Sequence, residues 1–340
     1  MILLSIIVPI YNRESLVESL YNALKLYNLV DVQIIIVDDG STDNTVESLK
    51  STFKDFINPV KILSRENSGP GGARNFGLKH AESTWVWFVD SDDAISIDAY
   101  EYLKNHNSDV DFIDFNILEA GNVVSSMTFE SGTYKVDETI KSSLINSFGR
   151  IWSKIFHQKF LARIDFRYPE YCVYEDNYLS LILPFKTERF SKVDQLAYIH
   201  NQNDSSVTRS LSFSERSYDR VLTSYQGFVD AAKFVKDQKQ AQALWNRFTA
   251  LFLYNSIYLF KEDFSLTNFS WFERINRISS TFNKLYPGLK EKLNFEVQNA
   301  PARPVISVLK NMFHLFPVKN PGLDFYSEKN KRNWEQRIKF

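Results

Sequence analysis

The sequence lacks several features that assign a chain to a class at once. It has one cysteine, Cys172, in 340 residues, which excludes an internal disulfide framework and is typical of a reducing compartment. Its formal net charge is −1, without the basic excess of a nucleic-acid-binding protein. No window approaches about 20 uninterrupted apolar residues, so we expect no membrane span. The start, "MILLSIIVPIYNRES", lacks the basic and apolar regions of a signal peptide. We therefore expect a cytoplasmic protein.

Two common phosphate-binding motifs are also missing. No GxGxxG follows the first apolar run, as a dinucleotide-binding fingerprint requires, and no Gly-Lys-Ser/Thr completes a Walker A loop. The segment "PIYNRES" after that run contains no glycine. A sugar nucleotidyltransferase would carry a glycine-rich loop with Arg or Lys there, so we keep that enzyme only as an alternative.

Apolar, β-rich runs alternate with helical patterns in the first 93 residues. The runs are nearly all apolar, which is typical of strands buried on both faces. This alternation predicts an α/β fold with a mostly parallel sheet flanked by helices. We expect strands at 4–11, 32–41, 60–67 and 84–90, and helices at 14–27, 41–53 and 71–83.

The pattern changes after about residue 100. Between 101 and 210 we expect short strands at "DFIDFNIL" and "GTYKV" and a helix over "SLINSFGRIWSKIFHQKFL". From 211 onward the pattern is mainly helical. We therefore predict a main domain over 1–210, with halves at 1–100 and 101–210, and a helical C-terminal region over 211–340.

Polar groups follow all four early strands, where parallel sheets bind ligands. They are Asn12, Asp38 with Asp39, "ENSGPGG", and "DSDD" at 90–93. "ENSGPGG" offers backbone N–H groups at a helix start, a favourable site for a diphosphate. The carboxylates of "DSDD" repel one another, so the stretch is either a surface turn or a site for a divalent cation.

In this order and spacing, the segments resemble the bacterial family 2 glycosyltransferases, which are inverting enzymes with the GT-A fold. The resemblance implies a nucleotide-sugar half over 1–100 and an acceptor half over 101–210. It rests on "SIIVPIYN", "IIIVDDGSTDNT", "ENSGPGGARNFGL", "WVWFVDSDD", "RIWSKIFHQKFL", "FRYPEYCVYEDNYLSL" and "SSVTRS".

The resemblance implies a binding site for a UDP-sugar at the strand ends. Pro9, Tyr11 and Asp39 are expected to line the uracil pocket. Arg74 is expected near the nucleotide, and Asp90 near ribose or sugar hydroxyls. Taken alone, Pro9 and Tyr11 would indicate only ordinary packing at a strand end.

The resemblance also implies a metal ion and a general base. Asp92 is expected to coordinate Mn²⁺ or Mg²⁺, with Asp93 as a second candidate. In "YEDN", Asp176 resembles the base that deprotonates the acceptor, with Glu175 beside it. The alternative for this pair is a charge cluster at a helix N-terminus.

Trp152 and Lys154 are expected beside the acceptor cleft, with core packing and a solvated lysine as an equal alternative. One segment departs from the family pattern: "YIHNQNDSSVTRS" has Asn201 and Asn203 where basic residues that reach the diphosphate usually stand. We expect His200 in that segment to be a packing residue. Arg209 is a candidate to compensate for the missing basic side chains.

The expected activity is metal-dependent, inverting transfer of a hexose or N-acetylhexosamine from a UDP-sugar to a hydroxyl of a glycan acceptor. The acceptor classes of the family include cell-surface polysaccharides, teichoic acids and glycoprotein glycans, linked to lipid or protein. A non-catalytic partner subunit with the same fold is the alternative from another class. The tail "SEKNKRNWEQRIKF" is locally basic, so weak contact with the inner face of a membrane and a homo-oligomer interface are further expectations.

Overall fold

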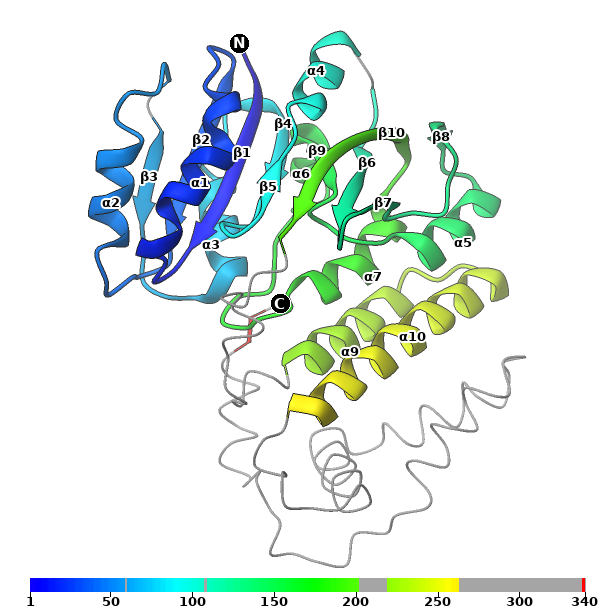
Figure 1. Ribbon diagram of the computed structural model, residues 1–340. Coiled ribbons are helices and arrows are strands. Elements are labelled where there is room, and N and C mark those ends of the chain that lie inside the picture. The colour runs from blue at the N-terminus through cyan, green and yellow to red at the C-terminus, as the bar shows by residue number, and fades with distance from the viewer. Residues whose placement is uncertain (59, 107–108, 202–218, 263–337, 340) are drawn as a thin grey trace, which may run out of the picture.

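The computed structural model describes residues 1–58, 60–106, 109–201, 219–262 and 338–339. Within these residues the chain forms one mixed sheet with helices packed on it (Figure 1). Neighbouring strands follow the order β3-β2-β1-β4-β9-β6-β10-β5, while β7 pairs with β6 and β8 with β10. The strands are β1 (Ile2–Ile10), β2 (Val32–Asp38), β3 (Lys61–Ser64), β4 (Ser83–Phe88), β5 (Ala94–Ile95), β6 (Phe112–Glu119), β7 (Asn122–Ser125), β8 (Gly132–Lys135), β9 (Lys154–His157) and β10 (Arg189–His200).

The first four strands pair in parallel, as predicted. Ile6 at the centre of β1 pairs with Ile34 of β2 on one side and with Trp87 of β4 on the other. Because these strands are parallel, their carboxyl ends lie at one edge of the sheet. That edge carries the loops in which the sequence places its polar motifs.

Helices cover both faces of the sheet. Short 3₁₀ turns at Glu14–Leu16 and Lys25–Tyr27 flank the first helix. The helices of the main domain are α1 (Val17–Leu24), α2 (Thr45–Thr52), α3 (Gly69–Leu78), α4 (Asp98–Asn105), α5 (Glu138–Ser147), α6 (Gln158–Arg163) and α7 (Asp176–Lys186).

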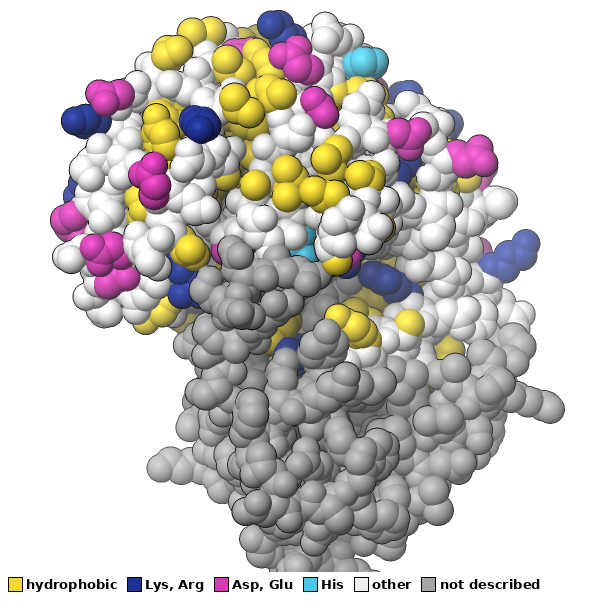
Figure 2. All heavy atoms as spheres, in the orientation of Figure 1, with side chains coloured by type: hydrophobic (Ala, Val, Ile, Leu, Met, Phe, Trp, Pro, Cys, Tyr) yellow, Lys and Arg dark blue, Asp and Glu magenta, His cyan; other side chains and the backbone are white. Residues whose placement is uncertain are grey.

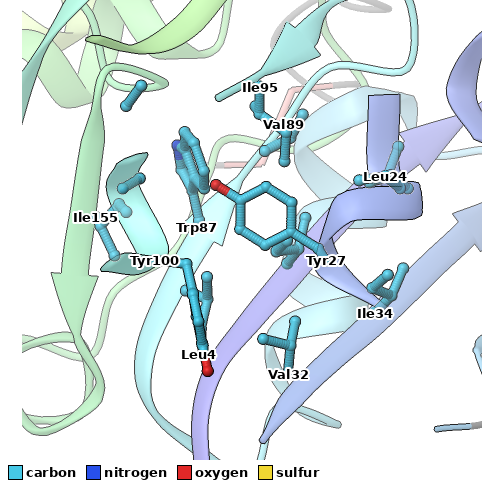
Figure 3. Close-up of a cluster of buried hydrophobic side chains, with 14 of the residues drawn as sticks. Leu4, Leu24, Tyr27, Val32, Ile34, Trp87, Val89, Ile95, Tyr100 and Ile155 are labelled. Carbon is cyan, nitrogen blue, oxygen red and sulfur yellow. The ribbon is translucent and has the colours of Figure 1, made fainter. Parts of the chain in front are cut away.

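The core consists of two apolar layers, one on each face of the sheet. Alternation along β1 places Ile6 and Val8 in the layer under α1, α2 and α4, and Ile7 in the layer under α3, α5, α6 and α7. Tyr27 is fully buried against Trp87 in the first layer (Figure 3). Its hydroxyl donates a hydrogen bond to the Ser96 carbonyl oxygen, which satisfies the one polar atom of the ring.

The predicted long helix over residues 143–161 is wrong in its middle. The chain instead forms α5, a loop, strand β9 and then α6. β9 is antiparallel to both neighbours, β4 and β6, and Ile155 and Phe156 enter opposite apolar layers. A four-residue strand buried on both faces is a short apolar run, and periodicity alone does not separate such a run from a helix.

Two helices from the predicted C-terminal region are described, α9 (Asp219–Ala232) and α10 (Gln238–Glu262). They lie side by side below α5 and α7 (Figure 1), and each contacts the main domain. α9 packs closely on α7: a Cβ added to Gly227 of α9 would stand 3.0 Å from the backbone of Tyr178 in α7. The described part is therefore helical as predicted. The boundary at 210 stays a prediction, since 202–218 lies outside the described residues.

The face of the main domain in Figure 2 carries acidic and basic side chains interspersed, without a large area of one sign. Such a surface agrees with the near-neutral net charge of the chain. Among the described residues, no helix combines the length and the apolar character needed to cross a membrane.

Candidate active site

A cleft of about 310 Å³ opens at the carboxyl edge of the sheet. The loops after β1, β2, β3 and β4 all contribute to its wall, so the convergence predicted from the sequence is present. The other wall comes from the loops before β9 and α7 and from the end of β10. Its lining includes Pro9, Tyr11, Asp39, Gly69, Arg74, Asp90, Asp92, Asp93, Trp152, Tyr168, Glu175, Asp176 and His200.

Asp39 is fixed at the β2 end of the cleft. Its backbone N–H donates to the Ile10 carbonyl, and its Oδ1 accepts from the Ser68 N–H at 3.0 Å. The side chain is almost fully buried, and burial raises the pKa of its carboxyl. Tyr11 at the end of β1 is exposed. A buried acceptor beside an exposed ring is a suitable arrangement for the edge and the face of a nucleobase.

The N-terminus of α3 lies against the loop that precedes α7. Gly69 begins the helix with φ +82°, and a Cβ there would stand 2.7 Å from the Cys172 carbonyl oxygen. Only glycine fits both the left-handed backbone and this close approach. The glycines of "SGPGG" therefore bring the donor-side loop and the "YEDN" loop together.

Arg74, one turn into α3, joins the two walls of the cleft. Its Nη2 lies 2.5 Å from Asp90 Oδ1, and its Nη1 donates to Glu175 Oε1. The guanidinium also lies over the Tyr168 ring, 5.1 Å from its centroid. Buried, doubly paired arginines hold their neighbours rigidly. Arg74 thus fixes one carboxylate from each wall.

The "DSDD" segment forms the floor of the cleft. Both oxygens of Asp93 accept hydrogen bonds, one from the Tyr198 hydroxyl at 2.7 Å and one from the Asn201 N–H at 2.8 Å. Burial, and next the charge of Asp90, raises the pKa of Asp93 to about 8. The pKa of Asp92 is raised for the same two reasons. A cation bound beside these carboxylates would favour their ionised form and offset the cost of burying their charge.

The donor set fits a hard divalent ion that takes part of its coordination from substrate. In the described part of the chain no three His, Cys, Asp or Glu side chains converge as a complete metal site. Asp92 faces the cleft, whereas both oxygens of Asp93 already accept protein hydrogen bonds. Mg²⁺ commonly binds through one or two carboxylates plus phosphate oxygens. Asp92 is therefore the residue suited to hold such an ion.

Asp176 is the first residue of α7 and lines the cleft. Burial is the main cause that raises the pKa of its carboxyl, with Arg74 opposing and Asp90 adding to the rise. Glu175, at the helix N-cap, is buried and bound to Arg74. The two acids are thus adjacent in sequence but differ in environment. Glu175 is bound to a cation, while Asp176 faces the cavity.

The loop that carries this pair is held by α9. Tyr174 has a left-handed backbone with φ 61°, and its carbonyl accepts from Thr223 Oγ1 at 2.9 Å. Asp219 Oδ2 accepts from the Val173 N–H at 3.1 Å. The described helices of the C-terminal region therefore help to shape the active-site cleft. Sequence reasoning missed these residues, because no local motif marks a partner about 50 positions away.

The two residues expected beside the acceptor cleft, Trp152 and Lys154, lie in different environments. Trp152 lines the cleft, with its ring centroid 4.3 Å from that of Tyr198 and 5.5 Å from that of His200. His200 thus contacts Trp152, and it also lines the cleft. Lys154 is absent from the lining and is fully buried, with its Nζ 2.8 Å from Asp114 Oδ1. We therefore do not keep Lys154 among the proposed acceptor contacts. Its ion pair instead supports the loop that carries the tryptophan.

The departure from the family pattern is described only in part. Asn201 donates from its side chain to the Asp92 carbonyl at 3.1 Å and from its backbone to Asp93. It holds the "DSDD" loop in the described structure. Asn203 and Arg209 lie outside the described residues.

Comparisons with known proteins agree with this arrangement. Residues 5–161 match the sequence family described as glycosyl transferase family 2. The uncharacterized glycosyltransferase EpsJ of Bacillus subtilis is 26% identical over 223 residues, which cover 61% of this chain and 63% of that protein. Poly(ribitol-phosphate) beta-N-acetylglucosaminyltransferase TarS of Staphylococcus aureus is 30% identical over 203 residues, 58% of this chain and 35% of TarS. The chain thus spans less than two thirds of either relative.

A solved structure extends the likeness beyond the matched segment. The crystal structure of TarS 1–349 in complex with UDP-GlcNAc has a TM-score of 0.58 and 22% identity to this chain, covering 92% of this chain and 90% of that one. At this identity the likeness shows the fold. Residues 5–161 of the chain thus match the family 2 glycosyltransferases, and the described structure has the GT-A fold of TarS.

Proposed function

We propose that this protein transfers a hexose or an N-acetylhexosamine from a UDP-sugar to an acceptor hydroxyl, with inversion at the anomeric carbon. One observation carries the proposal: a single cleft is lined both by Pro9, Tyr11 and Asp39 and by Asp176, a carboxylate that forms no ion pair with the described residues. The complex of TarS with UDP-GlcNAc supports a UDP-sugar as the donor.

In the proposed mechanism, Asp176 takes the proton of the acceptor hydroxyl as its oxygen attacks the anomeric carbon. The bond from that carbon to the diphosphate oxygen breaks, and UDP leaves with the electron pair. We propose that Asp90, which Arg74 holds in place, orients sugar or ribose hydroxyls. Burial raises the pKa of Asp176, which makes its carboxylate a stronger base than a solvated one.

We propose Asp92 as the protein ligand of a Mn²⁺ or Mg²⁺ ion, with Asp93 positioning the loop. When bound, such an ion would neutralise negative charge on the leaving diphosphate. The backbone N–H groups at the start of α3 would add to that stabilisation, because the N-terminus of a helix attracts anions.

For the acceptor we propose a hydroxyl on a cell-surface glycan or polyol-phosphate chain. The names of relatives support this class: TarS acts on poly(ribitol-phosphate), and the protein GgaA of Bacillus subtilis is named for minor teichoic acid biosynthesis. Extension of protein-linked glycans stays a further prediction. Membrane contact through the tail and self-association also stay predictions, because most of residues 263–340 lies outside the described structure.

The experiment that tests the proposal is hydrolysis of a panel of UDP-sugars by the purified full chain with Mn²⁺. We expect slow release of UDP from at least one of them, because water can replace the acceptor. Asp39→Ala should weaken donor affinity, and Asp176→Asn should slow release. If no UDP-sugar is hydrolysed and UDP does not bind, the chain is the non-catalytic partner subunit that the fold would also allow.

A further inference from the structure

Among the described residues, Arg247 on α10 is a partly buried cation without a carboxylate partner, close enough to Asp176 and Arg150 for their charges to act on it. Its Nε is buried and has no hydrogen-bond partner. In the described part of the structure its guanidinium forms no hydrogen bond and no ion pair. Proteins seldom bury an arginine unless a carboxylate or another anion pairs with it. The residue therefore needs an explanation.

The helix geometry places Arg247 near the loop of Trp152. Gln240, seven residues earlier on α10, donates to Glu138 at the start of α5. Residues seven apart share one face of a helix and lie about 10.5 Å apart along its axis. Arg247 therefore faces the main domain. The charge of Arg150, in the loop of residues 148–153 that follows α5, acts on it, and Ile151 and Trp152 of that loop line the cleft.

The electrostatic surroundings agree with this position. Burial lowers the pKa of Arg247, the charge of Asp176 opposes that change, and the charge of Arg150 adds to it. Its own charge also lowers the pKa of Lys154. The other two cations have carboxylate partners, since Arg150 binds Glu119 at 2.8 Å and Lys154 binds Asp114. Arg247 is the member of this group whose charge the described residues leave unpaired.

We propose that Arg247 binds an anionic group of the acceptor, a phosphate or a carboxylate, beside the hydroxyl that Asp176 deprotonates. The planar guanidinium offers two parallel N–H donors to either oxyanion. An anion there would also shield Arg247 from the positive charge of Arg150. A neutral glycan would leave the guanidinium unpaired, so the residue selects for charged acceptors. This inference rests on the proposed function and names the substrate class of the same cleft.

The test is calorimetric binding of three oligomers to the full chain without donor: a ribitol-phosphate hexamer, a hexagalacturonate and neutral maltohexaose. The wild type should bind one of the charged oligomers at least about ten-fold more tightly than the neutral one. Arg247→Gln should weaken that binding by roughly 10- to 100-fold, as expected for a lost hydrogen bond to a charged group. Lys239→Gln, an exposed charge on the same helix, should bind like the wild type.

The comparison of the two charged oligomers identifies the anion. Equal binding of charged and neutral oligomers by the wild type would overturn the proposal, as would wild-type affinity in Arg247→Gln. The assay needs no donor, so its outcome does not depend on whether the protein transfers a sugar. If no UDP-sugar is hydrolysed but charged oligomers bind through Arg247, the proposed reaction fails while the anion site stands.

A stability measurement separates binding from a structural role. Arg247→Met removes a partly buried charge that has no partner among the described residues, so the melting temperature of the variant should equal or exceed that of the wild type. If the arginine instead stabilises the end of α5, the melting temperature should fall and oligomer binding should be unaffected. That pair of results would contradict the proposal.

Discussion

Replacement of Asp176 by asparagine tests the proposed base. The change keeps the shape of the side chain but removes its ability to take a proton. A general base contributes about 10²–10⁴ in rate, or about 3–5.5 kcal/mol at 1.36 kcal/mol per tenfold. We expect the upper part of this range, because the nearby carboxylates of Glu175 and Asp90 are both paired with Arg74. No unpaired carboxylate in this part of the described cleft is then placed to replace Asp176.

The assay is single-turnover transfer at saturating donor, with UDP affinity measured in parallel. UDP affinity should change little, since the proposed nucleotide contacts are other residues of the cleft, Pro9, Tyr11 and Asp39. Thermal stability should not fall, because burial, the largest influence on its pKa, already disfavours the ionised form of Asp176. Glu175→Gln is the matched control and should affect transfer less while weakening the hold of Arg74. Near-normal transfer by Asp176→Asn together with an inactive Glu175→Gln would refute the assignment.

Four further predictions concern the rest of the site. Asp92→Asn should abolish the dependence of UDP affinity on Mn²⁺ in calorimetry, and retained dependence would exclude Asp92 as the ligand. The transfer rate should fall as pH decreases through the pKa of Asp176, which burial raises above its ordinary value of 3.8. The acidic limb of the pH–rate profile should therefore lie above pH 3.8 and be absent in Asp176→Asn. Lys154→Met should lower the free energy of unfolding, measured with denaturant, by about 3 kcal/mol. This is the lower end for a broken buried pair, because Lys192 stays 3.8 Å from Asp114. Arg167→Met, which breaks an exposed pair, should change the same free energy by under about 1 kcal/mol. Thr223→Val should cost about 1 kcal/mol and slow transfer at unchanged UDP affinity, and wild-type transfer would show that α9 does not position the Tyr174 loop.

The sequence predicted the parallel half of the sheet well, because buried parallel strands are nearly continuous apolar runs and their ends carry the polar motifs. One physical rule, that ligands bind at the carboxyl ends of parallel strands, also predicted that Asp39, Arg74 and Asp90 lie in one cleft. The roles proposed for these residues stay predictions until they are measured.

The remainder depended on contacts between distant parts of the chain. Strand β9 was expected as helix, because its four residues are too few to show a period. The sequence left Lys154 beside the cleft or, as an equal alternative, solvated, but Asp114, 40 positions away, holds it in the core. Arg74 was assigned to the nucleotide, yet its contacts with Glu175 and Asp90 make it a link between the two walls. The positions of Thr223 and Arg247 follow from the packing of α9 and α10, which a local pattern does not encode.

The central claim is inverting transfer from a UDP-sugar, and proton NMR of donor hydrolysis tests it most directly. The full chain is mixed with Mn²⁺ and an α-linked UDP-sugar, and the first-formed free sugar is observed before its anomers equilibrate. We predict the β anomer, because a base on the opposite face from the leaving diphosphate directs in-line attack. First appearance of the α anomer would contradict an inverting mechanism, and the absence of hydrolysis with every UDP-sugar would contradict the claim of a UDP-sugar donor.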